Sequence, residues 1–397
     1  MATWDTMWEA VWIYAGRPSD RPRTAYLLLD SRLKNESFAS GYPVVFASNH
    51  LSYVPENIRD GLNSEYTLNV LDGDFGLHHH PDTFLHESGH NLSLPSLQSE
   101  AETVVHMLHA AMYNLGRGRT MDEAFSRAMV NVPSGGHTFE EAAMDWMLAY
   151  NFRNNNPMGC DPTMAEDVCH EFRYQNRGHA KYADIAILFG WATGIGEINR
   201  MFYNRWGAQP DGLDKDEHQN FVTDDDYIET ASRALGVNAA PLFHFWGIHP
   251  SDQLAATLAD TYPRSDAIKN RFDFYRNLVP LSLAQFQPWY DSNRPVAGAP
   301  HYERYDNYLA SYDSDNIGQQ ILDQIDLVEA LYFCLDCGFA TPFSEPVFLD
   351  AGDDFSLAEG FSVSLNLSGA SVPLQVLSGD TSVATVSMTG VYSLSLA

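Results

Sequence analysis

Two histidines four residues apart place the strictest local demand on this chain. In the segment "FLHESGHN", His86 is followed directly by Glu87, and His90 completes the spacing. On a helix this spacing puts both imidazoles on one face, where they can bind one metal ion. Asp82 can cap the start of such a helix, and Pro95 ends it. The segment therefore predicts a short helix that carries a zinc site.

Glu87 gives this segment the H-E-x-x-H pattern, in which the glutamate is a general base rather than a ligand. Glu100 and Glu102 are the near candidates for a third ligand, and on the following helix they point about 200° apart. Glu100 shares its face with apolar residues, whereas Glu102 shares its face with His106, which can orient it from behind. We therefore expect Glu102 to bind the metal. The alternative is a capping box, in which Ser99 and Glu102 only start the helix.

Charge and hydropathy exclude two classes of partner. The chain has 397 residues and a formal net charge of −29, so it should repel phosphate backbones and is not expected to bind nucleic acid. It holds no run of 18 apolar residues, so we expect no transmembrane segment. A 45% hydrophobic composition is sufficient for a large packed core. Oligomeric state does not follow from any of these features.

Composition divides the chain into three parts. Residues 1–285 mix strand-like runs near the start with long helical patterns, and we expect them to form the catalytic domain. Residues 286–343 are expected to be a connector with one amphipathic helix. Residues 344–397 contain no Lys, Arg or His and alternate with period two, which is typical of a β-sandwich.

The remaining polar features give weaker predictions. Cys160 with Cys169, and Cys334 with Cys337, suit two short disulfides, while free thiols or structural zinc are the alternatives. The histidines at 78–80 and the acidic run 211–227 are expected to be solvated loops, although the acidic run could bind a cation. Large aromatic side chains are expected in the core; these are Trp146, Trp191, Trp206 and Trp246.

Several segments in the same order resemble one family. "HESGHN" with the later Glu102 looks like the enhancin-like and mucinase-like zinc metallopeptidases, peptidase family M-sixty. "WDTMWEAVWIYAG" and "SGYPVVF" resemble the segments before the zinc helix of that family, and "FGWATGIGEINRMFYNRW" and "LGVNAAPLFHFWGIHPSDQLAATL" resemble its later helices. The tail resembles a truncated PKD-type immunoglobulin-like module.

The resemblance implies a gluzincin-type α+β fold, with a small β-rich upper part, a larger helical lower part and a C-terminal β-sandwich segment. It implies that His86, His90 and Glu102 bind Zn²⁺ and that Glu87 is the base. It also implies mucin-like O-glycosylated protein as substrate and an extracellular or cell-surface location, the chain being a fragment of a longer secreted protein. The family has Asn where this chain has His106. Residues that bind the substrate are not assigned.

Two other functions are compatible with the residues. One is a general secreted zinc protease that is indifferent to glycans. The other is a glycoprotein-binding adhesin with an inactive peptidase domain, although an intact Glu87 argues against it. Cleavage of a mucin before and after removal of its O-glycans would distinguish all three.

Overall fold

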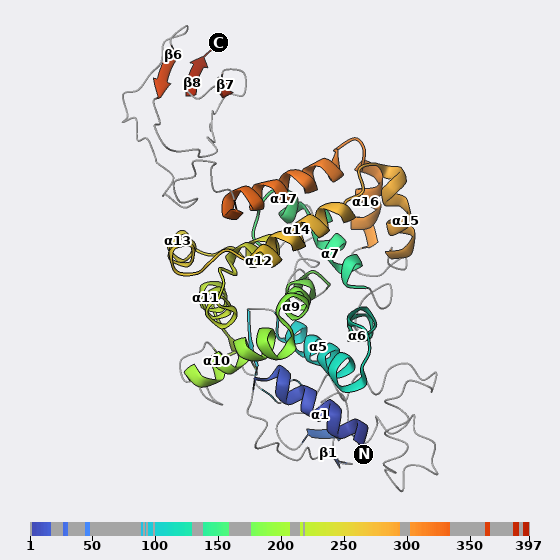
Figure 1. Ribbon diagram of the computed structural model, residues 1–397. Helices are drawn as coiled ribbons and strands as arrows, with labels where there is room; N and C mark the ends of the chain where they lie inside the picture. Colours follow the sequence, from blue (N-terminus) through green and yellow to red (C-terminus); the bar gives the residue numbers. More distant parts are fainter. Residues whose placement is uncertain are drawn as a thin grey trace.

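The computed structural model shows a chain that is mostly helical where it is described. It describes residues 2–16, 27–30, 44–47, 89, 92, 94–97, 100–128, 138–158, 176–206, 215–216, 219–293, 302–333, 362–365, 384–388 and 392–396. Figure 1 shows the helices rising from α1 and α5 at one end, through α9, to α14 and α17 at the other. The helical half of the fold prediction is therefore confirmed at this level.

The helices follow one another with short connections. Their bounds are α1 Ala2–Tyr14, α5 Ala101–Ala111, the π-helical η2 Met112–Gly116, α6 Met121–Ala128, α7 Phe139–Leu148, α8 Tyr150–Arg153, α9 Asn176–Phe189, the π-helical η4 Trp191–Gly196, α10 Glu197–Trp206, α11 Asp224–Leu235, α12 Ala240–Phe245, α13 Asp252–Thr261, α14 Asp266–Leu278, α15 Leu283–Asn293, α16 Tyr302–Ser311 and α17 Ile317–Phe333.

The described strands are short and form three small groups. They are β1 Leu27–Asp30 parallel to β2 Val44–Ala47; β5 Gln219–Phe221 between β3 Pro95–Ser96 and β4 Lys215–Asp216; and β8 Tyr392–Leu396 between β6 Ser362–Leu365 and β7 Ala384–Met388. These strands are too few to establish the expected β-rich upper part or the immunoglobulin-like tail. Both stay predictions.

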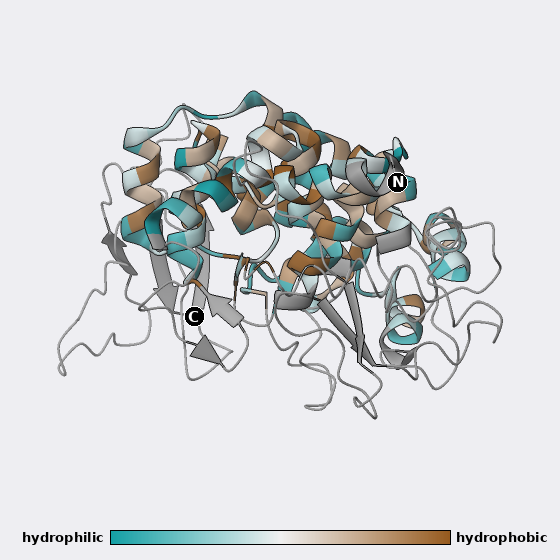
Figure 2. Ribbon diagram, turned by 90° about the horizontal axis from the view of Figure 1, so that it is seen from below, coloured by the Kyte–Doolittle hydropathy of each residue, from teal (hydrophilic) through white to brown (hydrophobic). Residues whose placement is uncertain are grey.

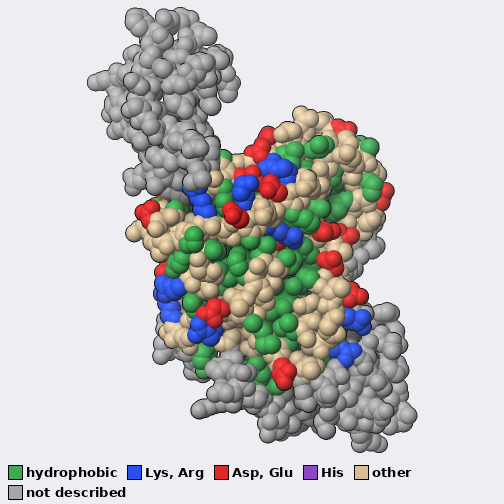
Figure 3. Space-filling view, in the orientation of Figure 1, with side chains coloured by type: hydrophobic (Ala, Val, Ile, Leu, Met, Phe, Trp, Pro, Cys, Tyr) green, Lys and Arg blue, Asp and Glu red, His purple; other side chains and the backbone are tan. Residues whose placement is uncertain are grey.

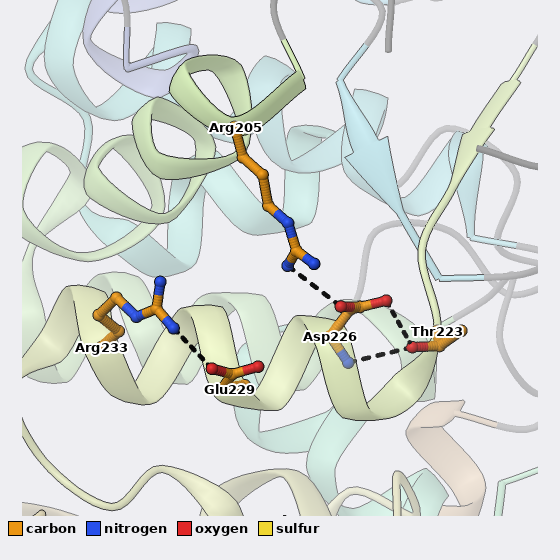
Figure 4. A network of polar contacts seen from close by, with 5 residues as sticks. All are labelled: Arg205, Thr223, Asp226, Glu229 and Arg233. Carbon is orange, nitrogen blue, oxygen red and sulfur yellow. Dashed lines mark hydrogen bonds and ion pairs between the residues drawn. The ribbon is translucent and has the colours of Figure 1, made fainter. Parts of the chain in front are cut away.

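Side-chain caps explain where several helices begin. Thr138 accepts a hydrogen bond from the Glu141 backbone N–H, and the Glu141 carboxylate accepts one from the Thr138 N–H, which is a capping box for α7. Thr223 caps α11 in the same sense by accepting from the Asp226 N–H (Figure 4). Asp226 also pairs with Arg205 of α10 at 3.1 Å. Part of the acidic run thus starts a helix, where negative charge is favourable.

The core lies where the helices face one another, and Figure 2 shows hydrophobic residues gathered there. Trp146 and Trp246 are fully buried, and Trp191 is 5% exposed. Each indole N–H has an acceptor: the Phe245 carbonyl, Asp184 and Asn114, respectively. The core prediction is confirmed for these three tryptophans, whereas the side chain of Trp206 lies outside the described residues.

Helix α1 packs unusually closely against segments that are distant in sequence. Tyr14 donates to the Val104 carbonyl of α5, and its own carbonyl accepts from Asn199 of α10. Gly16 has a φ of +63°, and a Cβ there would lie 1.9 Å from the carbonyl oxygen of Gly196 in η4. Only glycine permits both the positive φ and this approach.

The connector expected at 286–343 with one amphipathic helix is richer than predicted. Three helices lie in or extend into it, namely α15, α16 and α17. The aromatic residues Phe286, Tyr305 and Tyr312 of this segment belong to the main core cluster. Its Pro, Tyr, Asp and Asn content suggested a linker, yet aromatic spacing at helical intervals buries one face. The one-helix prediction was therefore wrong.

The described surface carries charges of both signs. On α14, Arg276 bridges Asp326 and Glu329 of α17 at 2.6 and 2.9 Å. Figure 3 shows acidic and basic side chains together over these helices. Among the helices described, none is both long enough and apolar enough to cross a membrane.

Candidate metal centre

The H-E-x-x-H segment is described at one position. His86, Glu87 and His90 lie outside the described residues, but Gly89 is described and has a helical backbone. The Leu92 N–H donates to the Gly89 carbonyl at 3.0 Å. The expected helix is therefore seen at Gly89, and Leu92 continues it as a turn.

Gly89 lies directly against α5. A Cβ added to Gly89 would lie 2.8 Å from Cγ1 of Val105 and 3.2 Å from Cδ2 of Leu108. Real Cβ atoms essentially never approach other atoms to 2.8 Å, so this crossing requires glycine. The contact brings the backbone of the histidine motif against the first two turns of α5.

Glu102 occupies a suitable place on that helix. Its backbone is the second residue of α5, and its side chain lies outside the described residues. Position 102 precedes Val105 by about one turn and is rotated from it by about 60°. Residue 100 is the N-cap of α5 and makes no side-chain cap, so the capping box expected as an alternative with Ser99 as N-cap does not match this helix start.

Glu100 faces a different neighbour and is fully buried. Its Oε1 pairs with Nζ of Lys181, and its Oε2 accepts from the Tyr182 hydroxyl at 2.6 Å; both partners are on α9. Burial and then the Glu100 charge raise the pKa of Tyr182 well above its usual value. Because its two carboxylate oxygens bind α9, Glu100 is unsuited to ligate a metal near Gly89.

His106, one turn after Glu102, also contacts α9. Its Nδ1 lies 2.8 Å from Nε2 of His179, and the two rings stack at 5.0 Å with an interplanar angle of 15°. Both side chains are 2% exposed. His106 is thus held by a hydrogen bond, as a residue that orients a ligand would be.

The sequence patterns missed the contribution of α9. The helical pattern was read from Lys181 onward, but α9 begins at Asn176, and His179 lies in its first half. His179 and His106 are separated by 73 residues, and Lys181 and Glu100 by 81. Local periodicity cannot report such pairs. The available signal was two polar side chains, His179 and Lys181, within an otherwise apolar helical stretch.

Other candidate residues remain untested. The four cysteines and the histidines at 78–80 lie outside the described residues, as does part of the run 211–227. In the part of the chain with described side chains, no three His, Cys, Asp or Glu residues converge on a possible metal position. The three expected ligands are not in that part.

The available geometry fits the expected metal. Two imidazoles and one carboxylate form a donor set that zinc favours, with a fourth position open to water. The Gly89 contact supplies the close approach between the two helices that would carry these donors. The described residues place no competing cation on the Gly89 side of α5.

Comparison with known proteins adds no function. No family model matches the chain, and no curated protein matches it. The crystal structure of a functionally unknown conserved protein from Bacillus anthracis str. Ames is similar over 66% of this chain and 46% of that chain, with a TM-score of 0.43 and 14% identity. A mutant protein described in the same terms gives a TM-score of 0.42, with 14% identity over 66% of this chain and 45% of that chain. The match thus spans less than half the length of these proteins.

Proposed function

We propose that this chain is a zinc-dependent endopeptidase that hydrolyses peptide bonds in mucin-like O-glycosylated proteins. The observation that carries the proposal is the contact of Gly89 with Val105 and Leu108. It brings the H-E-x-x-H backbone to the helix that bears Glu102, while Glu100 is held by Lys181 on another side. Resemblance to the enhancin-like and mucinase-like peptidases supplies the reaction and the substrate class.

The ligands in this proposal are His86, His90 and Glu102, and His106 orients Glu102. Zinc, when bound, polarises the scissile carbonyl and lowers the pKa of a bound water toward ~7. Glu87 accepts the proton of the attacking water and then passes it to the leaving amine. Neither transfer requires Glu87 to bind the metal.

The finer fold belongs to the same proposal. It comprises a gluzincin-type arrangement, with a β-rich part above the zinc helix and the described helices below it, and an immunoglobulin-like tail. An extracellular or cell-surface location follows from the proposed substrate. Trp146, Trp191 and Trp246 are buried, so they are not surface platforms for a sugar. An aromatic glycan platform would have to come from other side chains.

The proposal is tested with purified protein and one mucin substrate. We expect about one zinc per chain, cleavage of the glycosylated mucin and little cleavage after enzymatic removal of its O-glycans. Glu87→Gln should retain zinc and lose cleavage, because an amide cannot accept the water proton. Glu140→Gln, at an exposed glutamate in the first turn of α7, is the matched control for the loss of one charge.

The outcomes separate the three candidate functions. Equal cleavage of both mucin forms would favour a general protease. Binding of mucin without cleavage by the wild type would favour an adhesin. A wild-type chain without stoichiometric zinc, or a Glu87→Gln variant with normal turnover, would contradict the proposed mechanism.

A further inference from the structure

The hydrogen bond between His106 and His179 fixes more than the position of two rings. Both rings are 2% exposed, and Phe125 packs edge-on against His179 at 6.1 Å. In a bond between Nδ1 of one neutral imidazole and Nε2 of the other, one nitrogen donates and the other accepts. The direction of the bond therefore decides which nitrogen of His106 carries its proton.

Two directions are possible, and they have different consequences. If His106 donates from Nδ1, its Nε2 is bare and can only accept. If His179 donates from Nε2, His106 carries its proton on Nε2 and can donate from there. A carboxylate beside His106 needs a donor, and position 102 is the neighbour one helical turn earlier. The second direction is the one that supports Glu102 as a ligand.

The position of His179 is fixed by ties on the same helix. Lys181 and Tyr182 hold Glu100 of α5, and Lys181 also donates to the Gly178 carbonyl at 2.8 Å. Further along α9, the buried Asp184 accepts from Arg271, Tyr275 and Trp246 at 2.7 to 2.8 Å. Helix α9 is thus secured at several points and provides a rigid support for the imidazole of His179.

We infer that His179 is a positioning residue for the metal centre. It donates from Nε2 to Nδ1 of His106, fixes the Nε2–H tautomer of His106 and thereby directs an N–H toward Glu102. This inference rests on the proposed zinc site. It adds to that site a residue 77 positions beyond Glu102, on a helix that holds none of the proposed ligands.

The direct test is the tautomer of His106 in metal-free protein, measured by nitrogen-15 NMR of the imidazole nitrogens. We expect the proton on Nε2 in the wild type. His179→Phe keeps a planar ring but removes the donor, so the tautomer preference of His106 should be lost. His179→Gln places an amide N–H near the former Nε2 and should restore it.

The second measurement is zinc affinity, obtained by competition with a chelator. Loss of a hydrogen bond behind a ligand typically costs 10- to 100-fold, and we expect His179→Phe to fall in this range. His179→Gln should stay within a few-fold of the wild type. The double variant Glu100→Gln/Lys181→Met is the control, because it removes a neighbouring α9–α5 tie and leaves the histidine pair intact.

The outcomes distinguish this inference from the proposed function. A wild-type chain that binds no zinc would remove the proposed function and, with it, the role of His179. Zinc binding by the wild type with unchanged affinity in His179→Phe would overturn the inference alone. So would a wild-type His106 with its proton on Nδ1, whether or not His179→Phe folds. Equal affinity losses in His179→Phe and in the control variant would reduce His179 to a packing residue.

Discussion

The chain contains two buried pairs of stacked imidazole rings in different regions. In the α5–α9 region, His106 and His179 are joined by a hydrogen bond between their rings. In the α12–α17 region, His244 and His249 stack at 4.0 Å. His244 uses Nδ1 for the Tyr332 hydroxyl and Nε2 for Asn155 Oδ1, at 2.9 and 2.8 Å.

These partners give the two pairs different chemical roles. Asn155 Oδ1 can only accept, so His244 donates from Nε2 and accepts from Tyr332 at Nδ1. Both of its nitrogens are therefore engaged within the scaffold, since Tyr332 is on α17 and Asn155 follows α8. His106 instead sits one turn from a proposed metal ligand. A stacked histidine pair is thus informative about function only when its hydrogen-bond partners are known.

The strongest test of this contrast is Glu102→Gln. Replacing a charged ligand oxygen by a neutral one should lower zinc affinity by more than the roughly 100-fold typical of residues behind the ligands. His244→Phe, in the other region, should keep zinc affinity and lower only the unfolding temperature. Chelator competition and thermal unfolding measure the two effects. Stoichiometric zinc in Glu102→Gln would remove the α5–α9 region from the metal site.

Glu100→Gln sharpens the contrast within the α5–α9 region itself. Lys181 would keep its charge at 0% exposure and lose the carboxylate that balances it. Removing one partner of a buried ion pair typically costs about 3–5 kcal/mol, so we expect a loss of that size in the free energy of unfolding. Lys181→Met in the same chain should recover much of it. The reverse pattern in urea unfolding and zinc competition, normal stability with lost zinc, would make Glu100 the ligand.

Acid should act on the second pair. Burial lowers the pKa of His249 to about 4, and burial followed by the charge of His249 lowers that of His244. The unfolded chain therefore binds more protons than the folded chain between pH 6.5 and 4, so this contribution to stability is complete above 6.5 and is lost as pH falls. From the shift of His249 we expect a loss of roughly 2–3 kcal/mol in metal-free protein.

His249→Phe is the control for this prediction. Burial raises the pKa of Asp184 and of Glu329, which opposes the acid effect equally in both proteins. The difference between the two stability curves therefore isolates His249. Parallel curves between pH 6.5 and 4 would contradict its lowered pKa.

Gly89→Ala should give the smallest effect. Its Cβ would lie 2.8 Å from Val105 Cγ1, and overpacking of this kind costs about 1–3 kcal/mol. Alanine recovers about 1 kcal/mol of helix propensity, which leaves a net loss of up to about 2 kcal/mol. A double-mutant cycle with Val105→Ala should show favourable coupling. Additive effects would mean that the two residues do not touch.

The sequence predicted local features well and distant contacts poorly. Helical periodicity located α5 and α7, and it separated Glu100 from Glu102 because residues two apart face different directions. It did not predict the π-helical turns η2 and η4. It also missed α16, because Tyr305 and Tyr312 stand among Asp, Asn and Ser, a composition typical of loops. His179 could not be assigned, since its role depends on a partner 73 residues away.

The close packing of α1 has a consequence for synthesis on the ribosome. The Tyr14 carbonyl is bonded by Asn199, 185 residues later, and Gly16 abuts Gly196. At about 5–20 residues per second, α1 leaves the ribosome roughly 10–40 s before these partners exist. Throughout that interval Met7 and Val11, which are fully buried in the finished fold, have no native surface to cover them. A nascent chain of this protein is therefore a client for chaperones from its first helix onward.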